Sequence, residues 1–148
     1  MTKYGGAVLA VLLAVSTVSF GRKEETLEQL VARADAAKPD KQPDLYMEAA
    51  ERGIKSAGDL YKGDHPKEFR EALQQIIKFC DSAHAAAMQS NKHIKNTEIK
   101  IRRISLRLRD IKFDADIDDQ PQVQTAIDRL ESFRTELLHS MFGSKSND

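Results

Sequence analysis

Tryptophan is absent from this 148-residue sequence, cysteine occurs once, and basic and acidic residues cancel to a formal net charge of zero. The single cysteine, Cys80, cannot form a disulfide within its own chain, so stability must come from packing. Because Cys80 lies far from the start of the chain, a lipid-modified cysteine at a cleavage point is excluded as well. A balanced charge gives no overall field toward nucleic acid, and no aromatic residues alternate with the basic ones. We therefore expect neither a disulfide scaffold nor a nucleic-acid-binding protein.

Motifs for catalysis are also missing from the sequence. It contains no glycine-rich phosphate loop, no nucleophile elbow and no recognisable pair of catalytic carboxylates. Cys80 and His84 are four residues apart, a spacing that could place two ligands on one metal ion, but two ligands do not make a site. We interpret Cys80 as a small buried hydrophobic residue. The prediction is a noncatalytic protein with no catalytic residues, no metal and no cofactor.

Four aspartates, Asp114, Asp116, Asp118 and Asp119, fall close together without a basic residue among them. Such a run resembles the oxygen-rich loops that hold calcium, but the central glycine and distal glutamate of an EF-hand loop are missing. We interpret at least one aspartate as a helix cap before Pro121.

Long apolar runs are scarce, and the longest is at the N-terminus. Lys3 precedes an almost wholly apolar run from Ala7 to Val18, and Ser19-Phe20-Gly21 has small residues at both ends. This pattern is typical of a secretory signal peptide, and the run is shorter than the ~20 residues of a spanning helix. We predict a signal peptide over residues 1–21, export to a periplasmic or secreted location, one helical domain over 22–142 and a disordered tail over 143–148.

What the chain does contain is a helical repeat of apolar and small residues from Phe69 to Ile111. Thirteen of them recur at alternating steps of four and three: Phe69, Leu73, Ile76, Cys80, Ala83, Ala87, Ser90, Ile94, Thr97, Ile101, Ile104, Leu108 and Ile111. This spacing predicts one long central helix over about 66–112 with coiled-coil-like heptad packing. The poor helix formers in Gln89-Ser90-Asn91-Lys92 leave an alternative open, in which a break there gives a compact bundle of five short helices.

Other helices follow from apolar spacing and from proline. Leu27, Leu30, Val31 and Ala34 predict a short helix over about 24–37. Pro43, Pro66 and Pro121 predict helix starts, and Gly63 and Gly143 predict left-handed helix ends. The expected helices are therefore 43–62, 66–112 and 121–142, and the fold class is an all-α antiparallel bundle. The helix over 43–62 should pack closely against the first half of the central helix, because Gly53 and Gly58 are small.

Ile99, Leu106 and Phe113 recur every seven residues, away from the main apolar line. Three apolar residues on one side predict a second neighbour for this half of the helix. It could be the N-terminal helix or a second copy of the chain.

The segment from Leu60 to Ala83 reads LYKGDHPKEFREALQQIIKFCDSA. Its Leu-Tyr-x-x-Gly-Asp turn and the following helix resemble one tetratricopeptide-repeat hairpin, over about residues 43–83. The overall layout is similar to uncharacterised exported helical proteins of bacteria. The resemblance implies a helical hairpin of the kind that serves as a binding scaffold.

Basic residues gather in the stretch 92–112, which has eight of them and only two acidic residues, Glu98 and Asp110. They give either a solvated face or a surface for an anionic partner such as lipid headgroups or an envelope polymer. The residues expected on that surface are Lys95, Arg102, Arg103 and Arg109. We predict a noncatalytic exported binding or scaffolding module for an unknown protein or an anionic envelope component, with self-association possible and no nucleic acid bound. Two alternatives stay open, a periplasmic chaperone or envelope-stress protein and a module that binds envelope polymer or lipid through the basic face.

Overall fold

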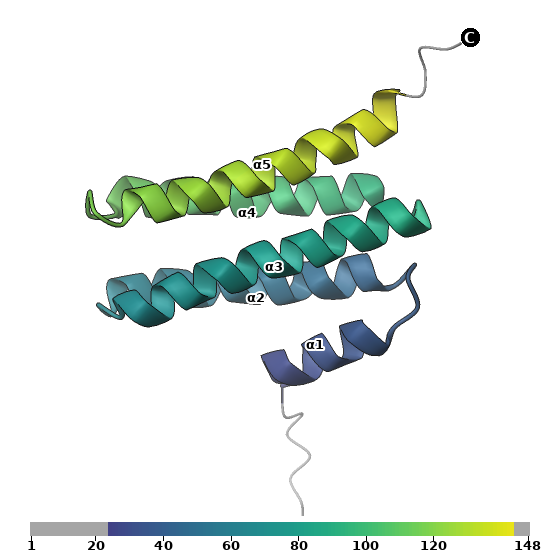
Figure 1. The fold of residues 1–148 in the computed structure, drawn as a ribbon. Coiled ribbons are helices and arrows are strands. Elements are labelled where there is room, and N and C mark those ends of the chain that lie inside the picture. The colour runs from purple at the N-terminus through teal and green to yellow at the C-terminus, as the bar shows by residue number, and fades with distance from the viewer. Residues whose placement is uncertain (1–23, 144–148) are drawn as a thin grey trace, which may run out of the picture.

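The computed structural model describes residues 24–143, and within them the chain forms five α-helices (Figure 1). The predicted signal peptide and residues 144–148 of the predicted tail lie outside the described residues. The helices are α1 Leu27–Ala36, α2 Gln42–Lys62, α3 Pro66–Ser90, α4 Ile94–Asp114 and α5 Gln120–Phe142. The predicted all-α antiparallel bundle is confirmed.

Two helical hairpins make up the bundle. Helices α2 and α3 form one and α4 and α5 form the other, and the hairpins pack together through α3 with α5 and α2 with α4. The short helix α1 packs on α2, on the side of the first hairpin that faces away from the second (Figure 1). The first hairpin is thus covered on both sides, whereas no helix in residues 24–143 lies on the far side of the second.

The prediction of one long helix over 66–112 is wrong, and the alternative with a break is correct. α3 ends at Ser90, and α4 starts at Ile94 after a turn in which Asn91 and His93 have positive φ angles of 53° and 61°. Asparagine tolerates this left-handed conformation better than most residues, so the turn forms without glycine. The break lets α4 fold back beside α2, where Asp44 accepts a hydrogen bond from Asn96 at 2.8 Å.

The features predicted for the helix starts agree with the structure better than those predicted for the helix ends. Proline occupies the first turn of α2, α3 and α5 as predicted, and Thr26 caps α1 through a reciprocal capping box with Gln29. The left-handed glycine ends are wrong, because Gly63 and Gly143 have φ angles of −81° and −72°. In the turn between α2 and α3, the residue with a left-handed conformation is instead Asp64, with φ of 56°.

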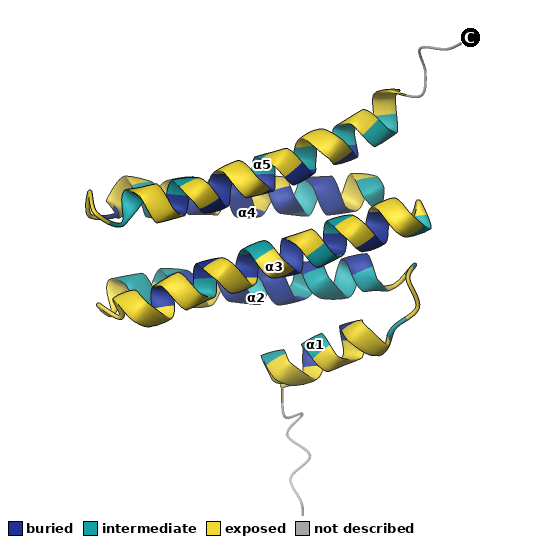
Figure 2. Ribbon diagram, viewed as in Figure 1, coloured by how far each residue is buried: buried dark blue, intermediate teal, exposed yellow. Residues whose placement is uncertain are grey.

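A single apolar cluster contains residues from all five helices, and each helix turns its buried side toward it (Figure 2). A Cβ atom at Gly53 would lie 3.0 Å from Cγ1 of Ile76, which confirms that α2 and α3 approach closely there. At Gly58 no atom lies within 4 Å of that position, so close packing does not explain the second glycine. The core thus fixes α4 with one side inward and the other side free for function.

Candidate binding surface on α4

Ionic contacts hold the inward side of α4 against α5. The carboxylate of Glu98, only 5% exposed, accepts hydrogen bonds from Nε and Nη2 of Arg134 at 2.9 and 2.8 Å. The same guanidinium donates to Glu131 at 2.8 Å, and Glu131 also accepts a 2.6 Å hydrogen bond from the buried hydroxyl of Ser105. Breaking a buried ion pair by removing one partner is costly, because the other charge stays buried. This network lies on the side of α4 that also faces the apolar core, so it adds a polar contact between α4 and α5 to the apolar packing there.

The outward side of α4 carries a line of alternating basic and apolar residues at steps of four and three. We call it the outer stripe; its members are Lys95, Ile99, Arg102, Leu106, Arg109 and Phe113. All are exposed except Ile99, which is half-buried, and the exposed fractions of Leu106 and Phe113 are 51% and 89%. Steps of four and three keep residues on one helix face. The outer stripe is therefore one continuous surface that is both basic and apolar.

The structure brings together three of the four predicted anionic-partner residues. Lys95, Arg102 and Arg109 lie on the outer stripe, whereas Arg103 lines a groove of about 340 Å³ on the opposite flank, between α4 and α2. Arg103 lies 3.8 Å from Glu51, and Arg109 lies 3.4 Å from Glu131. Within residues 24–143, Lys95 and Arg102 have no carboxylate within 4.0 Å. These two cations are free to meet an external anion.

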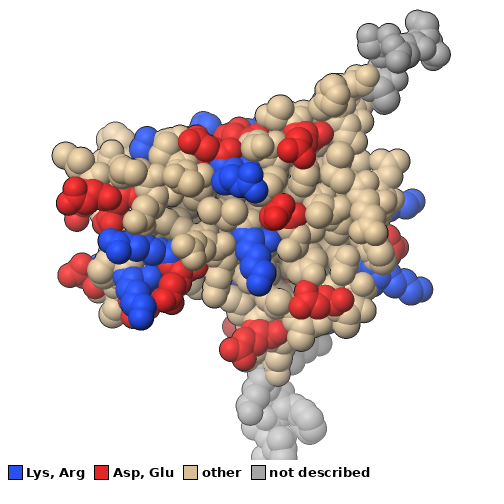
Figure 3. Space-filling view, in the orientation of Figure 1, with Lys and Arg blue, Asp and Glu red and all other residues tan. Residues whose placement is uncertain are grey.

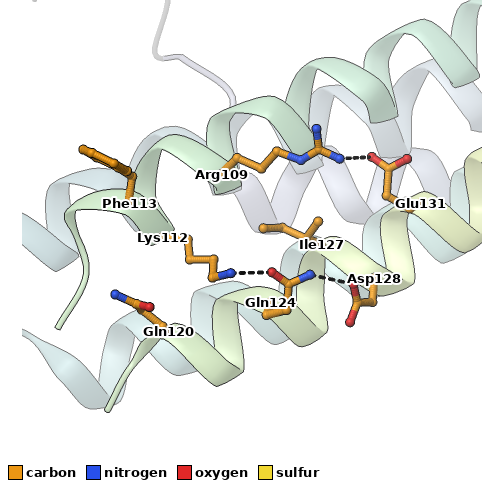
Figure 4. Close-up of a pocket in the computed structure, with 8 residues that line it drawn as sticks. All are labelled: Arg109, Lys112, Phe113, Gln120, Gln124, Ile127, Asp128 and Glu131. Atoms are coloured by element: carbon orange, nitrogen blue, oxygen red, sulfur yellow. Dashed lines mark hydrogen bonds and ion pairs between the residues drawn. The ribbon is translucent and has the colours of Figure 1, made fainter. Parts of the chain in front are cut away.

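A groove of about 600 Å³ between α4 and α5 borders the outer stripe (Figure 4). Two polar bridges cross it: Lys112 donates to Gln124 at 2.7 Å, and Arg109 reaches Glu131. Ile127 lies between the bridges, and the ring of Phe113 points away from them (Figure 4). The groove floor is thus closed by side chains that satisfy one another, and the exposed apolar surface is on the stripe.

The second neighbour expected for Ile99, Leu106 and Phe113 is not the N-terminal helix, because α1 packs on α2. The other expectation, a second copy of the chain, stays a prediction. On the face formed by α3 and α5, acidic and basic side chains are interspersed among neutral ones (Figure 3).

Cys80 and His84 belong to the core rather than to a reactive site. Cys80 is fully buried, and burial, with a smaller effect of the Asp81 charge, raises the pKa of its thiol far above the ordinary value. The His84 ring stacks on Phe133 at 5.2 Å, and its Nε2 lies 3.0 Å from the Glu136 carboxylate without the alignment of a hydrogen bond. Within residues 24–143, no three His, Cys, Asp or Glu side chains are placed so that they could hold one metal ion together. A protonated, enclosed thiol is a poor nucleophile.

The acidic turn joins α4 to α5 and is held by Tyr61. The tyrosine hydroxyl accepts a 2.7 Å hydrogen bond from the backbone N–H of Asp116. The interpretation of an aspartate as a side-chain cap of α5 is wrong: Asp119 occupies the cap position without a capping hydrogen bond and lies 3.8 Å from Arg70 instead. The Asp119 carboxylate thus forms an ion pair that joins the first hairpin to the second.

Compared with protein-family models, curated proteins and solved structures, the chain matches none of them. None of the helices in the described part combines the length and the hydropathy of a membrane span.

The sequence analysis noted the basic residues of α4 and its apolar residues at seven-residue spacing separately. Their common spacing, in which bases and apolar residues alternate at steps of four and three, is the signal that would have joined them.

Proposed function

We propose that this chain is a noncatalytic helical binding module, exported from the cell, whose partner docks on the outer stripe of α4. The observation that supports this most is the exposure of Leu106 and Phe113 beside Lys95 and Arg102, two cations without a carboxylate nearby in the described residues. Exposed apolar residues gathered on one surface mark interaction sites more often than scattered ones do.

The division of α4 into two sides supports the same function. Its inward side uses its polar groups within the fold, since Glu98 accepts hydrogen bonds from Arg134 of α5 and Ser105 donates one to Glu131 of α5. A buried polar network whose members are satisfied makes the core more rigid. The outward side is the part on which Leu106, Phe113 and two cations without a carboxylate nearby in the described residues, Lys95 and Arg102, are left for a partner.

Photo-crosslinking in the producing cell tests this proposal without knowledge of the partner. A photoreactive amino acid replaces Leu106 on the outer stripe or, as the control, Met88, which is 41% exposed on α3. We expect a defined adduct, identified by mass spectrometry as protein, lipid or polymer, from position 106 and not from position 88. Equal adducts from both positions, or none from position 106, would contradict the proposal.

A chaperone for apolar clients is the second candidate function. It is favoured by Ile117 and Phe142, which are 83% and 65% exposed and lie beyond the outer stripe. Suppression of client aggregation at substoichiometric or variable ratios would favour the chaperone, whereas saturable binding at one fixed ratio would favour the docking module.

A further inference from the structure

We propose that the partner of the outer stripe is an anionic lipid surface, on which α4 lies parallel to the membrane plane. This inference rests on the proposed function and adds the chemical class of the partner. In it, Lys95, Arg102 and Arg109 contact lipid phosphates, while Leu106 and Phe113 enter the boundary between headgroups and acyl chains.

The alternation of charge and apolar side chain points to lipid rather than to a protein groove. Protein interfaces usually have an apolar centre with charge at the rim. On the outer stripe Ile99 and Leu106 instead each have a base one turn away on either side, and Phe113 has Arg109 one turn before it. A headgroup layer offers phosphate and hydrocarbon side by side along its whole extent, and long basic side chains can reach phosphate while their neighbours bury.

Charge complementarity gives the sign of the surface. Helix α4 has seven basic residues and three acidic ones, and Glu98 is turned inward to Arg134. Asp110 and Asp114 are the other two acidic residues; neither is a member of the outer stripe, but Asp110 is exposed one turn from Leu106 and Phe113 and is the one acidic residue of α4 that borders the stripe between them. Clustered bases of this kind are attracted to anionic lipid, and the attraction decreases over a distance of about one Debye length.

A second copy of the chain fits the outer stripe less well. If two copies met stripe to stripe, the bases Lys95, Arg102 and Arg109 of both copies would share one interface, and the outer stripe has no acidic member to pair with them. Like charges brought together across an interface oppose association. Self-association is therefore one of the outcomes that the test must distinguish.

The acidic turn sets the limit of the contact. Ile117 is 83% exposed but lies between Asp116 and Asp118, whose charges an anionic surface would repel. We infer that the lipid contact runs from Lys95 to Phe113 and ends there.

The test uses the full chain with an environment-sensitive thiol dye at Leu106→Cys or, as the control, at Met88→Cys. Cys80 is buried and its thiol stays protonated, so the introduced cysteine is the one labelled. Vesicles are made either of phosphatidylcholine alone or of equal parts phosphatidylcholine and phosphatidylglycerol. The dye reports its own surroundings, and Met88→Cys is the control for attachment of the chain to the vesicle through any other segment.

We expect a blue shift at position 106, and none at position 88, with the anionic vesicles only. Changing Lys95, Arg102 and Arg109 together to Gln should weaken binding to the anionic vesicles on the order of 100-fold, since each base near an anionic surface raises the affinity roughly fivefold. The matched control changes three exposed lysines of α2 and α3 to Gln, which removes the same number of positive charges away from the outer stripe: Lys62, Lys67 and Lys78. That control should bind within about twofold of the parent by the same reasoning.

Other outcomes overturn the lipid inference. Equal shifts at positions 106 and 88, or with neutral vesicles, would show nonspecific adsorption. A shift at position 106 that depends on protein concentration and not on lipid would show a second copy. No shift with either vesicle, together with a protein adduct from position 106 in the crosslinking experiment, would refute lipid as the partner and leave the docking function standing.

Discussion

Two glycines of α2 have different physical roles although they are five positions apart on one helix. Gly53 is buried where α2 meets Ile76 of α3, and Gly58 faces open space. Glycine in a helix interior costs about 1 kcal/mol relative to alanine. That cost is offset by close packing at Gly53, and the structure offers no such compensation at Gly58.

Gly58→Ala is therefore expected to raise the free energy of unfolding by about 0.5–1 kcal/mol, because it improves helix propensity without a clash. Gly53→Ala should gain less or lose stability, since its Cβ would lie 3.0 Å from Ile76 Cγ1. Urea denaturation followed by circular dichroism measures both. A larger gain at position 53 than at position 58 would contradict the packing described for α2 and α3.

The pair Glu98 and Arg134 is a buried ionic contact between α4 and α5. Arg134→Leu should cost about 3–5 kcal/mol, because it leaves the Glu98 carboxylate buried without its partner. Changing Glu98 and Arg134 together to Leu should cost clearly less, since no unpaired charge remains. A double variant as unstable as the single one would show that the loss comes from packing and not from the stranded charge.

At the scale of elements, the turn between α3 and α4 decides the architecture. Asn91 and His93 are both left-handed, but only His93 also lies near a partner, with its Nδ1 3.2 Å from Asp44. The turn therefore has one residue that only sets backbone geometry and one that also contacts α2.

Asn91→Gly is expected to keep or slightly raise stability, because glycine adopts a positive φ freely. Asn91→Val should lower it by about 1–2 kcal/mol or more, since a β-branched residue strongly disfavours this conformation. Thermal unfolding of the two variants measures the difference. Equal melting temperatures would contradict the left-handed turn and would instead fit a continuous helix.

The apolar pattern predicted which sides of α3 and α4 are buried but not that they are separate helices. Phe69 through Ala87 and Thr97 through Leu108 hold their buried positions as the spacing indicates, and Ser90 and Ile94 keep the same spacing across the turn. Periodicity reports the buried face of each segment, and the break depends on two local backbone angles that leave the spacing unchanged. Pairs such as Glu98 with Arg134 are distant in sequence, so no local pattern could reveal them.

At the scale of the whole molecule, the two hairpins differ in what covers them. The first packs between α1 and the second hairpin, and the second is open on its far side within the described chain. The formal charge of the sequence is zero, yet α4 is basic and the turn after it is acidic. Composition alone hides this separation of charge between α4 and the turn after it.

Lysine footprinting of the unmodified protein tests the central claim, that the outer stripe is the docking surface, most directly. An acylating reagent is applied to the protein in its cell envelope fraction and to the purified protein, and labelling is quantified by mass spectrometry. Lys95 lies on the outer stripe, and Lys67 and Lys78 are exposed on α3. We expect Lys95 to be protected in the envelope while Lys67 and Lys78 react equally in both samples. Unchanged reactivity of Lys95 with protection of the α3 lysines would place docking on the other hairpin and contradict the claim.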